Sequence, residues 1–155
     1  MRKRHNNIGY YSQPTIYKNK LVFVCENDLW EVSTGGGKAN RLTNAISEIH
    51  SPFFSPDANF ISCCAKEEGE HDIYIMESKG GQLKRLTWLN TVTNVLGWSN
   101  DGKNIFFRST HEAIHSKGCD AWLFKVPVKG GSVEVLPFGP AMTFSQQQTA
   151  KKSII

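Results

Sequence analysis

The sequence contains one pattern associated with catalysis, His111-Glu112-Ala113-Ile114-His115. In zinc proteases the pattern H-E-x-x-H lies on a helix, where both histidines bind the metal and the glutamate acts as a general base. Here it falls in a polar segment between two expected strands, and Gly118 closes that segment early. No third ligand is evident, although Cys119 is near. We interpret the segment as a solvated loop; adventitious metal binding, or a zinc hydrolase using His111, Glu112 and His115, is the alternative.

Other patterns that could support chemistry are incomplete. The run Gly97-Trp98-Ser99-Asn100-Asp101 lacks the last glycine of G-x-S-x-G. The run Gly35-Gly36-Gly37-Lys38-Ala39 lacks the upstream glycine and the Ser or Thr of a phosphate loop, so it indicates a hairpin turn. We therefore predict no catalytic, cofactor-binding or metal-binding residue in this chain.

The remaining candidate side chains have structural interpretations. The cysteines form no C-x-x-C pair, and we expect buried, reduced thiols, with two of them on opposite faces of one strand. We expect the tryptophans to be core aromatics, two histidines to pack at strand ends, and an acidic run to form a solvated loop tip. These residues are Cys25, Cys63, Cys64 and Cys119; Trp30, Trp88, Trp98 and Trp122; His50 and His71; and Glu67, Glu68 and Glu70.

Composition and charge exclude several classes of protein. The chain has 155 residues, 39% of them hydrophobic, which suits one globular domain. The longest apolar run, Leu21–Cys25, is too short to span a membrane. Five of the 18 basic residues lie in the two ends, which leaves 13 basic against 14 acidic residues over 5–150. That distribution does not favour nucleic-acid binding. The basic N-terminus is followed by no apolar stretch, so we expect a cytoplasmic protein without a secretory signal.

The most informative feature is a repeat of 44 residues. The turn Ser55-Pro56-Asp57-Ala58 recurs as Ser99-Asn100-Asp101-Gly102, and Arg41-Leu42-Thr43 recurs as Arg85-Leu86-Thr87. Glycine pairs recur after each group of short runs rich in β-branched and aromatic residues. Such a period, with four strands in each repeat, is typical of β-propeller blades.

The repeat predicts an all-β fold, a partial β-propeller of about three four-stranded antiparallel blades. We place the propeller at 11–141, with blades at about 11–43, 48–87 and 94–136, a basic tail at 1–10 and a disordered or truncated tail at 142–155. The third repeat is six residues longer, and comparison of Lys66–Asp72 with Arg108–Asp120 places the excess in one loop. Because Ala58 replaces a turn glycine, the second blade's turn should be looser, with a strain of about 1 kcal/mol.

Several segments resemble tricorn proteases over about residues 8–141, with TolB-type propellers as looser kin. The segments include Gly9–Pro14, Asp28-Leu29-Trp30, Glu67–His71, Val95–Ser99 and Leu136–Ala141. The resemblance implies a part of the six-bladed N-terminal propeller of a large cytosolic serine protease. Such propellers are thought to filter or channel peptides, and the family's catalytic residues lie in a C-terminal region that has no counterpart here.

The resemblance therefore implies a non-catalytic propeller segment with a peptide-gating or scaffolding role, inactive alone. Its partners would be peptides and the remainder of a tricorn-type protease. An alternative is an interaction module in which two copies of three blades complete a six-bladed ring. We expect no nucleic-acid or membrane partner and no cofactor.

Overall fold

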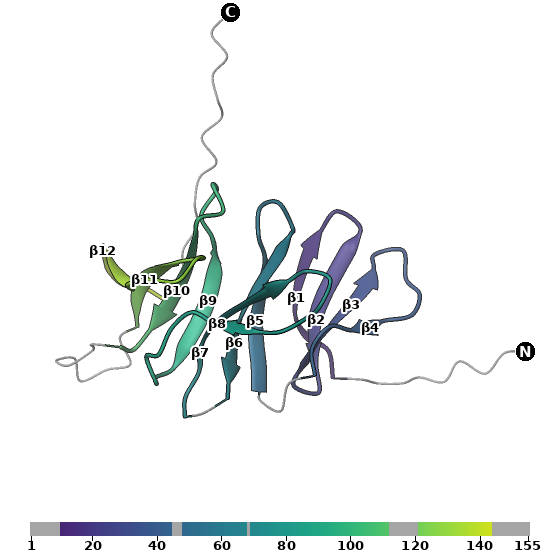
Figure 1. Cartoon of the computed structure of the whole chain (residues 1–155), viewed down its shortest axis with the longest axis horizontal. Helices are drawn as coiled ribbons and strands as arrows, with labels where there is room; N and C mark the ends of the chain where they lie inside the picture. The colour runs from purple at the N-terminus through teal and green to yellow at the C-terminus, as the bar shows by residue number, and fades with distance from the viewer. Residues whose placement is uncertain (1–9, 45–47, 68, 112–120, 144–155) are drawn as a thin grey trace, which may run out of the picture.

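The regular structure consists of three four-stranded antiparallel sheets. The computed structural model describes residues 10–44, 48–67, 69–111 and 121–143. Within each sheet the strands pair in chain order (Figure 1). Blade 1 comprises β1 (Ser12–Tyr17), β2 (Lys20–Cys25), β3 (Asp28–Ser33) and β4 (Asn40–Arg41); blade 2 comprises β5 (Glu48–Phe54), β6 (Phe60–Lys66), β7 (Asp72–Glu77) and β8 (Lys84–Arg85); blade 3 comprises β9 (Thr93–Trp98), β10 (Asn104–Ser109), β11 (Trp122–Pro127) and β12 (Glu134–Pro140).

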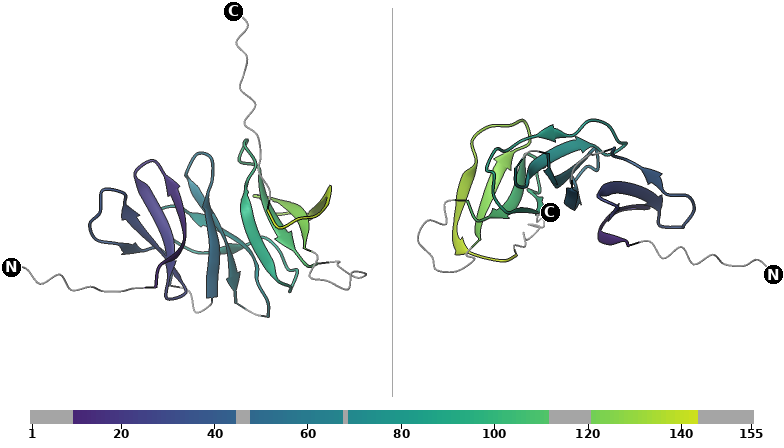
Figure 2. Two further views of the ribbon diagram at one scale, coloured as in Figure 1. Left: turned by 180° about the vertical axis from the view of Figure 1, so that it is seen from behind. Right: turned by 90° about the horizontal axis from the view of Figure 1, so that it is seen from below.

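The blades stand side by side and follow an arc when the molecule is seen from below (Figure 2). The first strand of each blade contacts the first strand of the next, β1 with β5 and β5 with β9. The predicted fold class is therefore confirmed. Most of the two expected tails, residues 1–9 and 144–155, lies outside the described residues. The described part contains no helix long and apolar enough to cross a membrane.

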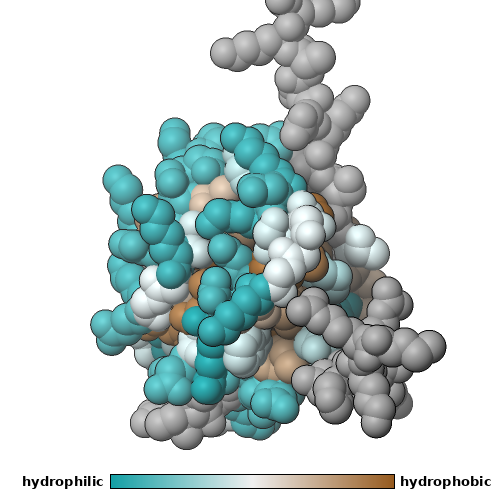
Figure 3. All heavy atoms as spheres, turned by 90° about the vertical axis from the view of Figure 1, so that its right-hand side faces the viewer, coloured by the Kyte–Doolittle hydropathy of each residue, from teal (hydrophilic) through white to brown (hydrophobic). Residues whose placement is uncertain are grey.

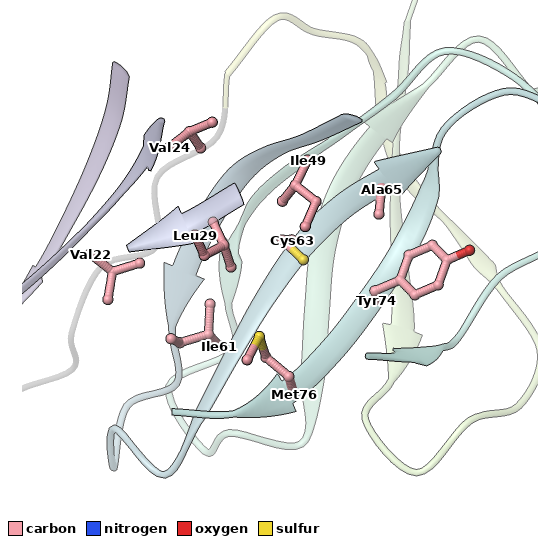
Figure 4. Packing of buried hydrophobic residues seen from close by; sticks show 9 residues of the cluster. All are labelled: Val22, Val24, Leu29, Ile49, Ile61, Cys63, Ala65, Tyr74 and Met76. Atoms are coloured by element: carbon pink, nitrogen blue, oxygen red, sulfur yellow. The ribbon is translucent and has the colours of Figure 1, made fainter. Parts of the chain in front are cut away.

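Each blade packs against its neighbour through alternate residues of its strands. Ile61, Cys63 and Ala65 of β6 face blade 1, together with Tyr74 and Met76 of β7 (Figure 4). The intervening residues of the same strands, including Cys64, Ile73 and Ile75, face blade 3. The prediction that Cys63 and Cys64 point to opposite faces is confirmed. Both are buried free thiols, and burial raises the pKa of Cys63 to about 12.

The first strand of every blade is bulged at the same place. Two residues oppose one residue of the second strand at Gln13-Pro14, at Ser51-Pro52 and at Val95-Leu96. The bulges also link the blades, because the Ser51 amide donates a hydrogen bond to Oε1 of Gln13 and the Val95 amide donates to Sγ of Cys64 at 3.3 Å. A bulge exposes backbone groups that would otherwise serve the sheet ladder. Here those groups hold adjacent blades in register.

The extra residues of blade 3 lie where the sequence places them, but the repeat aligns differently. Residues 66–71 separate the pair Ala65 and Asp72, whereas residues 110–121 separate the pair Ser109 and Trp122. The six-residue excess is thus confined to the loop between the second and third strands. However, the residue equivalent to Asp72 is Trp122 and not Asp120, which lies outside the described residues. Register across the sheet, rather than the recurrence of an aspartate, sets the alignment.

The turn at Ala58 is not looser than its counterpart. The amides of Ala58 and Gly102 each donate a 2.8 Å hydrogen bond to the carbonyl three residues earlier. Asp57 and Asp101 each accept bonds from the serine two residues before and from the amide two residues after. Ala58 adopts φ of 56°, in the left-handed region, and Gly102 adopts 69°. The side-chain hydrogen bonds hold the same turn in both blades. The backbone of Ala58 is therefore strained, and the turn does not open.

Replacing Ala58 by glycine should therefore stabilise the chain. We expect Ala58→Gly to raise the free energy of unfolding by up to about 1 kcal/mol, because glycine has no steric penalty at positive φ. Urea unfolding followed by circular dichroism measures the change. Gly102→Ala is the matched variant and should lower stability by a similar amount, since the added Cβ meets only Pro56 Cδ at 3.7 Å. A destabilised Ala58→Gly variant would contradict this account.

Candidate functional site

The zinc-protease pattern is only partly within the described structure. His111 is described, whereas Glu112 and His115 lie outside the described residues. The ring of His111 lies 6.3 Å from that of Phe124, and it lines a hollow of about 190 Å³ with Trp122 and Val135. Among the described residues no three His, Cys, Asp or Glu side chains form a group that could hold a metal ion.

The repeated Arg-Leu-Thr segment closes a buried polar cluster, for which we use the name clasp. In blade 2, Oδ1 of Asp72 accepts a 2.6 Å hydrogen bond from the Thr87 hydroxyl, and Oδ2 accepts a 2.6 Å bond from Arg85. The Thr87 hydroxyl oxygen in turn accepts from the Ile73 amide at 2.9 Å, and Oδ1 of Asp72 also accepts from the Leu89 amide. Asp72 is fully buried. A buried carboxylate is stable only when it is paired in this way.

Blade 1 repeats the clasp, and blade 3 lacks it. In blade 1, Asp28 pairs with Arg41 and accepts a 2.7 Å bond from Thr43, whose hydroxyl oxygen accepts from the Leu29 amide at 3.0 Å. The strand register of blade 3 puts Trp122, Val135 and Pro137 at the three positions of the clasp. Blade 3 therefore has apolar side chains at the three positions that form the clasp in the other two blades.

Two histidines that the sequence leaves unconnected form a pair. The rings of His50 and His71 lie 4.4 Å apart, edge to face, although β6 separates them in the chain. Nδ1 of His50 lies 3.0 Å from the hydroxyl of Ser51, and His71 lies 3.9 Å from Glu70. Burial, and secondarily the neighbouring His71, lower the pKa of His50 to about 4. The pairing depends on the register of three strands, which no local pattern signals.

Two other expectations need correction. Trp88 is not a core aromatic: it is 71% exposed and stacks over the guanidinium of Arg85. The acidic loop after β6 is not wholly a solvated tip, because Glu67 accepts a 3.2 Å hydrogen bond from the Tyr74 hydroxyl and His71 is largely buried. Glu68 lies outside the described residues.

The outer face of blade 1 is apolar at every position that packs in blade 2. Strand register makes Leu21, Phe23, Cys25, Trp30 and Val32 the equivalents of the blade 2 residues that pack on blade 1. A hollow of about 380 Å³ lies on this face, lined by Leu21, Phe23 and Val32 and by residues of β1. Figure 3 views the molecule from the side of blade 1 and shows apolar residues among hydrophilic ones. The face thus has the same kind of side chains as the face of blade 2 that packs on blade 1.

The outer face of blade 3 has a different chemistry. Phe106 and Leu123 on this face are buried, but the two other equivalent positions carry Arg108 and Lys125. Lys125 pairs with Glu134 at 2.9 Å, and Arg108 donates to the carbonyl of Met142 at 3.3 Å. One open face of the arc is thus apolar and the other is mixed.

Three side-by-side meanders with bulged inner strands define the chain as part of a β-propeller. It matches the family described as "Tricorn protease N-terminal beta propeller domain" over residues 8–155, and it belongs to that family. The crystal structure of the tricorn protease superposes with a TM-score of 0.77 at 23% identity, covering 90% of this chain and 14% of that one. A putative TolB from Agrobacterium tumefaciens gives a TM-score of 0.70 at 20% identity, covering 84% and 47%.

Relatives in sequence are considerably longer or somewhat longer than this chain. The chain is 28% identical to tricorn protease homolog 1 of Streptomyces coelicolor over 139 residues, which span 89% of this chain and 13% of that protein. It is 30% identical to a putative Tricorn-like protease N-terminal subunit of Sulfurisphaera tokodaii over 139 residues, spanning 85% of this chain and 68% of the relative.

Breaking a clasp should destabilise the fold strongly. We expect Thr87→Val to lower the free energy of unfolding by about 2–3 kcal/mol, because it leaves the Ile73 amide and one bond of the Asp72 carboxylate unsatisfied in the interior. Thr43→Val should have a similar effect in blade 1. The exposed Thr34 supplies the control, since Thr34→Val removes no clasp bond. Urea unfolding distinguishes the three variants, and equal stabilities would show that the clasps contribute nothing.

The histidine pair predicts a loss of stability in mild acid. The folded state keeps His50 neutral, with a pKa of about 4 against 6.5 for the free side chain. As the pH falls from about 6.5 to 4, His50 becomes protonated in the unfolded chain but stays neutral in the folded chain. The free energy of unfolding therefore falls by on the order of 2 kcal/mol, a value that allows for the partial solvation of the ring. His50→Gln should flatten this dependence, and His71→Gln should reduce it. An unchanged slope in His50→Gln would assign the effect to other groups.

Proposed function

We propose that this chain is a non-catalytic propeller segment of a tricorn-type peptidase, which scaffolds the assembly or gates peptides in cytoplasmic peptide degradation. The observation that carries the proposal is the apolar outer face of blade 1, which has the side chains of a blade interface. An apolar face of this kind favours a permanent neighbour over free solvent. Membership of the tricorn N-terminal propeller family supplies that neighbour, namely further blades of the same propeller.

The proposal assigns the chain no bond-breaking chemistry. Its partners are the remainder of a tricorn-type protease and the peptides that protease handles. The Sulfurisphaera tokodaii relative, described as an N-terminal subunit, supports the idea that such a propeller can be a separate subunit of a larger assembly.

A second candidate function is an interaction module in which two copies complete a six-bladed ring. The same apolar face favours it, because blade 3 of a second copy could cover blade 1. The mixed outer face of blade 3 makes this contact less favourable than a contact between two apolar faces, since Arg108 would have to leave water or find a partner.

The solution mass of the purified chain distinguishes the two functions. A propeller segment should be a 17.4 kDa monomer that binds a hydrophobic dye, with dye binding reduced by Phe23→Ser on the outer face of blade 1. The self-completing module should instead be a dimer that Phe23→Glu dissociates. Light scattering on a sizing column measures the mass, and Val92→Ser, at an exposed site between β8 and β9, is the control.

The same sample tests the absence of catalysis. Neither function predicts hydrolysis of a fluorogenic peptide. Turnover that a serine-protease inhibitor abolishes would contradict both, and turnover that a metal chelator abolishes and zinc restores would support the pattern at 111–115 instead.

A further inference from the structure

A cleft of about 690 Å³ lies between blades 2 and 3, at the end of the sheets where their first and second strands turn. Its apolar walls come from both blades and include Phe60 and Ile75 of blade 2 and Trp98 and Val128 of blade 3. Phe60 is 41% exposed, so an aromatic ring is available to a ligand. The indole nitrogen of Trp98 is occupied by a 3.1 Å hydrogen bond to the carbonyl of Phe53, which fixes the ring between the blades.

The cleft carries charges of both signs. Asp57 and Asp101, which are equivalent residues of the two turns, line it together with Lys84 and Lys129. The serine hydroxyls, and then the backbone amides of the turns, lower the pKa of both carboxyl groups, so these side chains remain anionic in mild acid. The lysines belong to the outer part of each blade, one on β8 and one in the turn after β11.

The charges of the turns distinguish this cleft from the junction of blades 1 and 2. The turn between β1 and β2 consists of Lys18 and Asn19, so blade 1 contributes no carboxylate at the equivalent place. The junction of blades 2 and 3 thus combines two turn aspartates with two lysines and an apolar wall, and the described part of the junction of blades 1 and 2 does not. A ligand that presents a cation, an anion and an apolar group within a small volume would complement this lining.

We propose that this cleft binds short peptides with free termini, with the α-ammonium group directed to Asp57 and Asp101 and the α-carboxylate directed to Lys84 and Lys129. A side chain of the peptide packs on Phe60 and Trp98. The volume falls within the range of small-ligand sites and suits two or three residues. The proposal rests on the proposed function in that a tricorn-type propeller would meet such peptides, but the site itself follows from the lining charges.

The test is a titration of the full chain with the tripeptide Ala-Leu-Ala, followed by NMR. We expect the indole N–H resonance of Trp98 to shift, and the N-acetylated and the C-amidated peptides to bind about fivefold more weakly, as expected for the loss of exposed ion pairs. Asp57→Asn with Asp101→Asn should weaken binding of the free peptide by the same factor. It should not weaken binding of the acetylated peptide further, since both changes remove one interaction.

The double variant Lys84→Gln with Lys129→Gln should weaken binding of the free peptide by the same factor. It should not weaken binding of the C-amidated peptide further, because both changes remove one interaction. Glu26→Gln and Lys38→Gln, at exposed sites of blade 1, are the controls, because each removes one charge of the same sign outside the cleft. The two asparagine substitutions keep an acceptor for the turn amides, and NMR dispersion confirms that each variant is folded.

Peptide affinity that is unchanged by N-acetylation, by C-amidation and by substitution of the two aspartates and two lysines would overturn the cleft assignment. The proposed peptide-handling role would then still stand. Absence of binding at millimolar peptide would also overturn the cleft assignment. A failure of the proposed function appears elsewhere, in the solution mass and the dye binding.

Discussion

Blades 1 and 2 each have two apolar faces, and this constraint governs the rest of the structure. Blade 2 satisfies it fully, because Ile61 and Cys63 pack on blade 1 while Cys64 and Ile73 pack on blade 3. Burial of apolar area is the main favourable term in folding, and a four-stranded sheet covered on one side forfeits about half of it. Among the described residues, no further sheet covers the apolar outer face of blade 1. The proposed assembly role follows from that uncovered face.

Polar interactions decide how the blades hold together once the apolar faces have brought them into contact. The clasps fix the last strand of blades 1 and 2 through a buried carboxylate, and the bulges let blades 2 and 3 each donate a hydrogen bond to the preceding blade. Blade 3 replaces its clasp by Trp122 and Val135 and carries the long loop that includes His111. The replaced clasp and the longer loop meet at the start of β11, at the end of the arc where the outer face is mixed in character.

The two surfaces with proposed roles have opposite physical properties. The outer face of blade 1 is broad and apolar, which favours a permanent contact within an assembly. The cleft between blades 2 and 3 is small and charged at its rim, which favours reversible binding of a small, polar ligand. A propeller segment of a peptidase needs both kinds of surface, one to hold its place and one to meet peptides.

The sequence by itself determined the local structure and its repetition. The 44-residue period, the turn serines and aspartates, and the alternation of apolar residues were sufficient to predict three antiparallel blades, because turns and strands depend on neighbours within a few residues. The same reasoning located the insertion of blade 3, and the residues outside the generic repeat identified the family.

Only the tertiary structure decided which distant side chains meet. The pairing of His50 with His71, the clasp of Asp72 with Thr87 and the alignment of Trp122 with Asp72 all depend on strand register across a sheet. The cleft depends on two turns that are 44 residues apart. A sequence specifies such contacts only through the summed packing of whole faces. A single residue such as Ala58 can therefore be forced into a strained conformation that its own type disfavours.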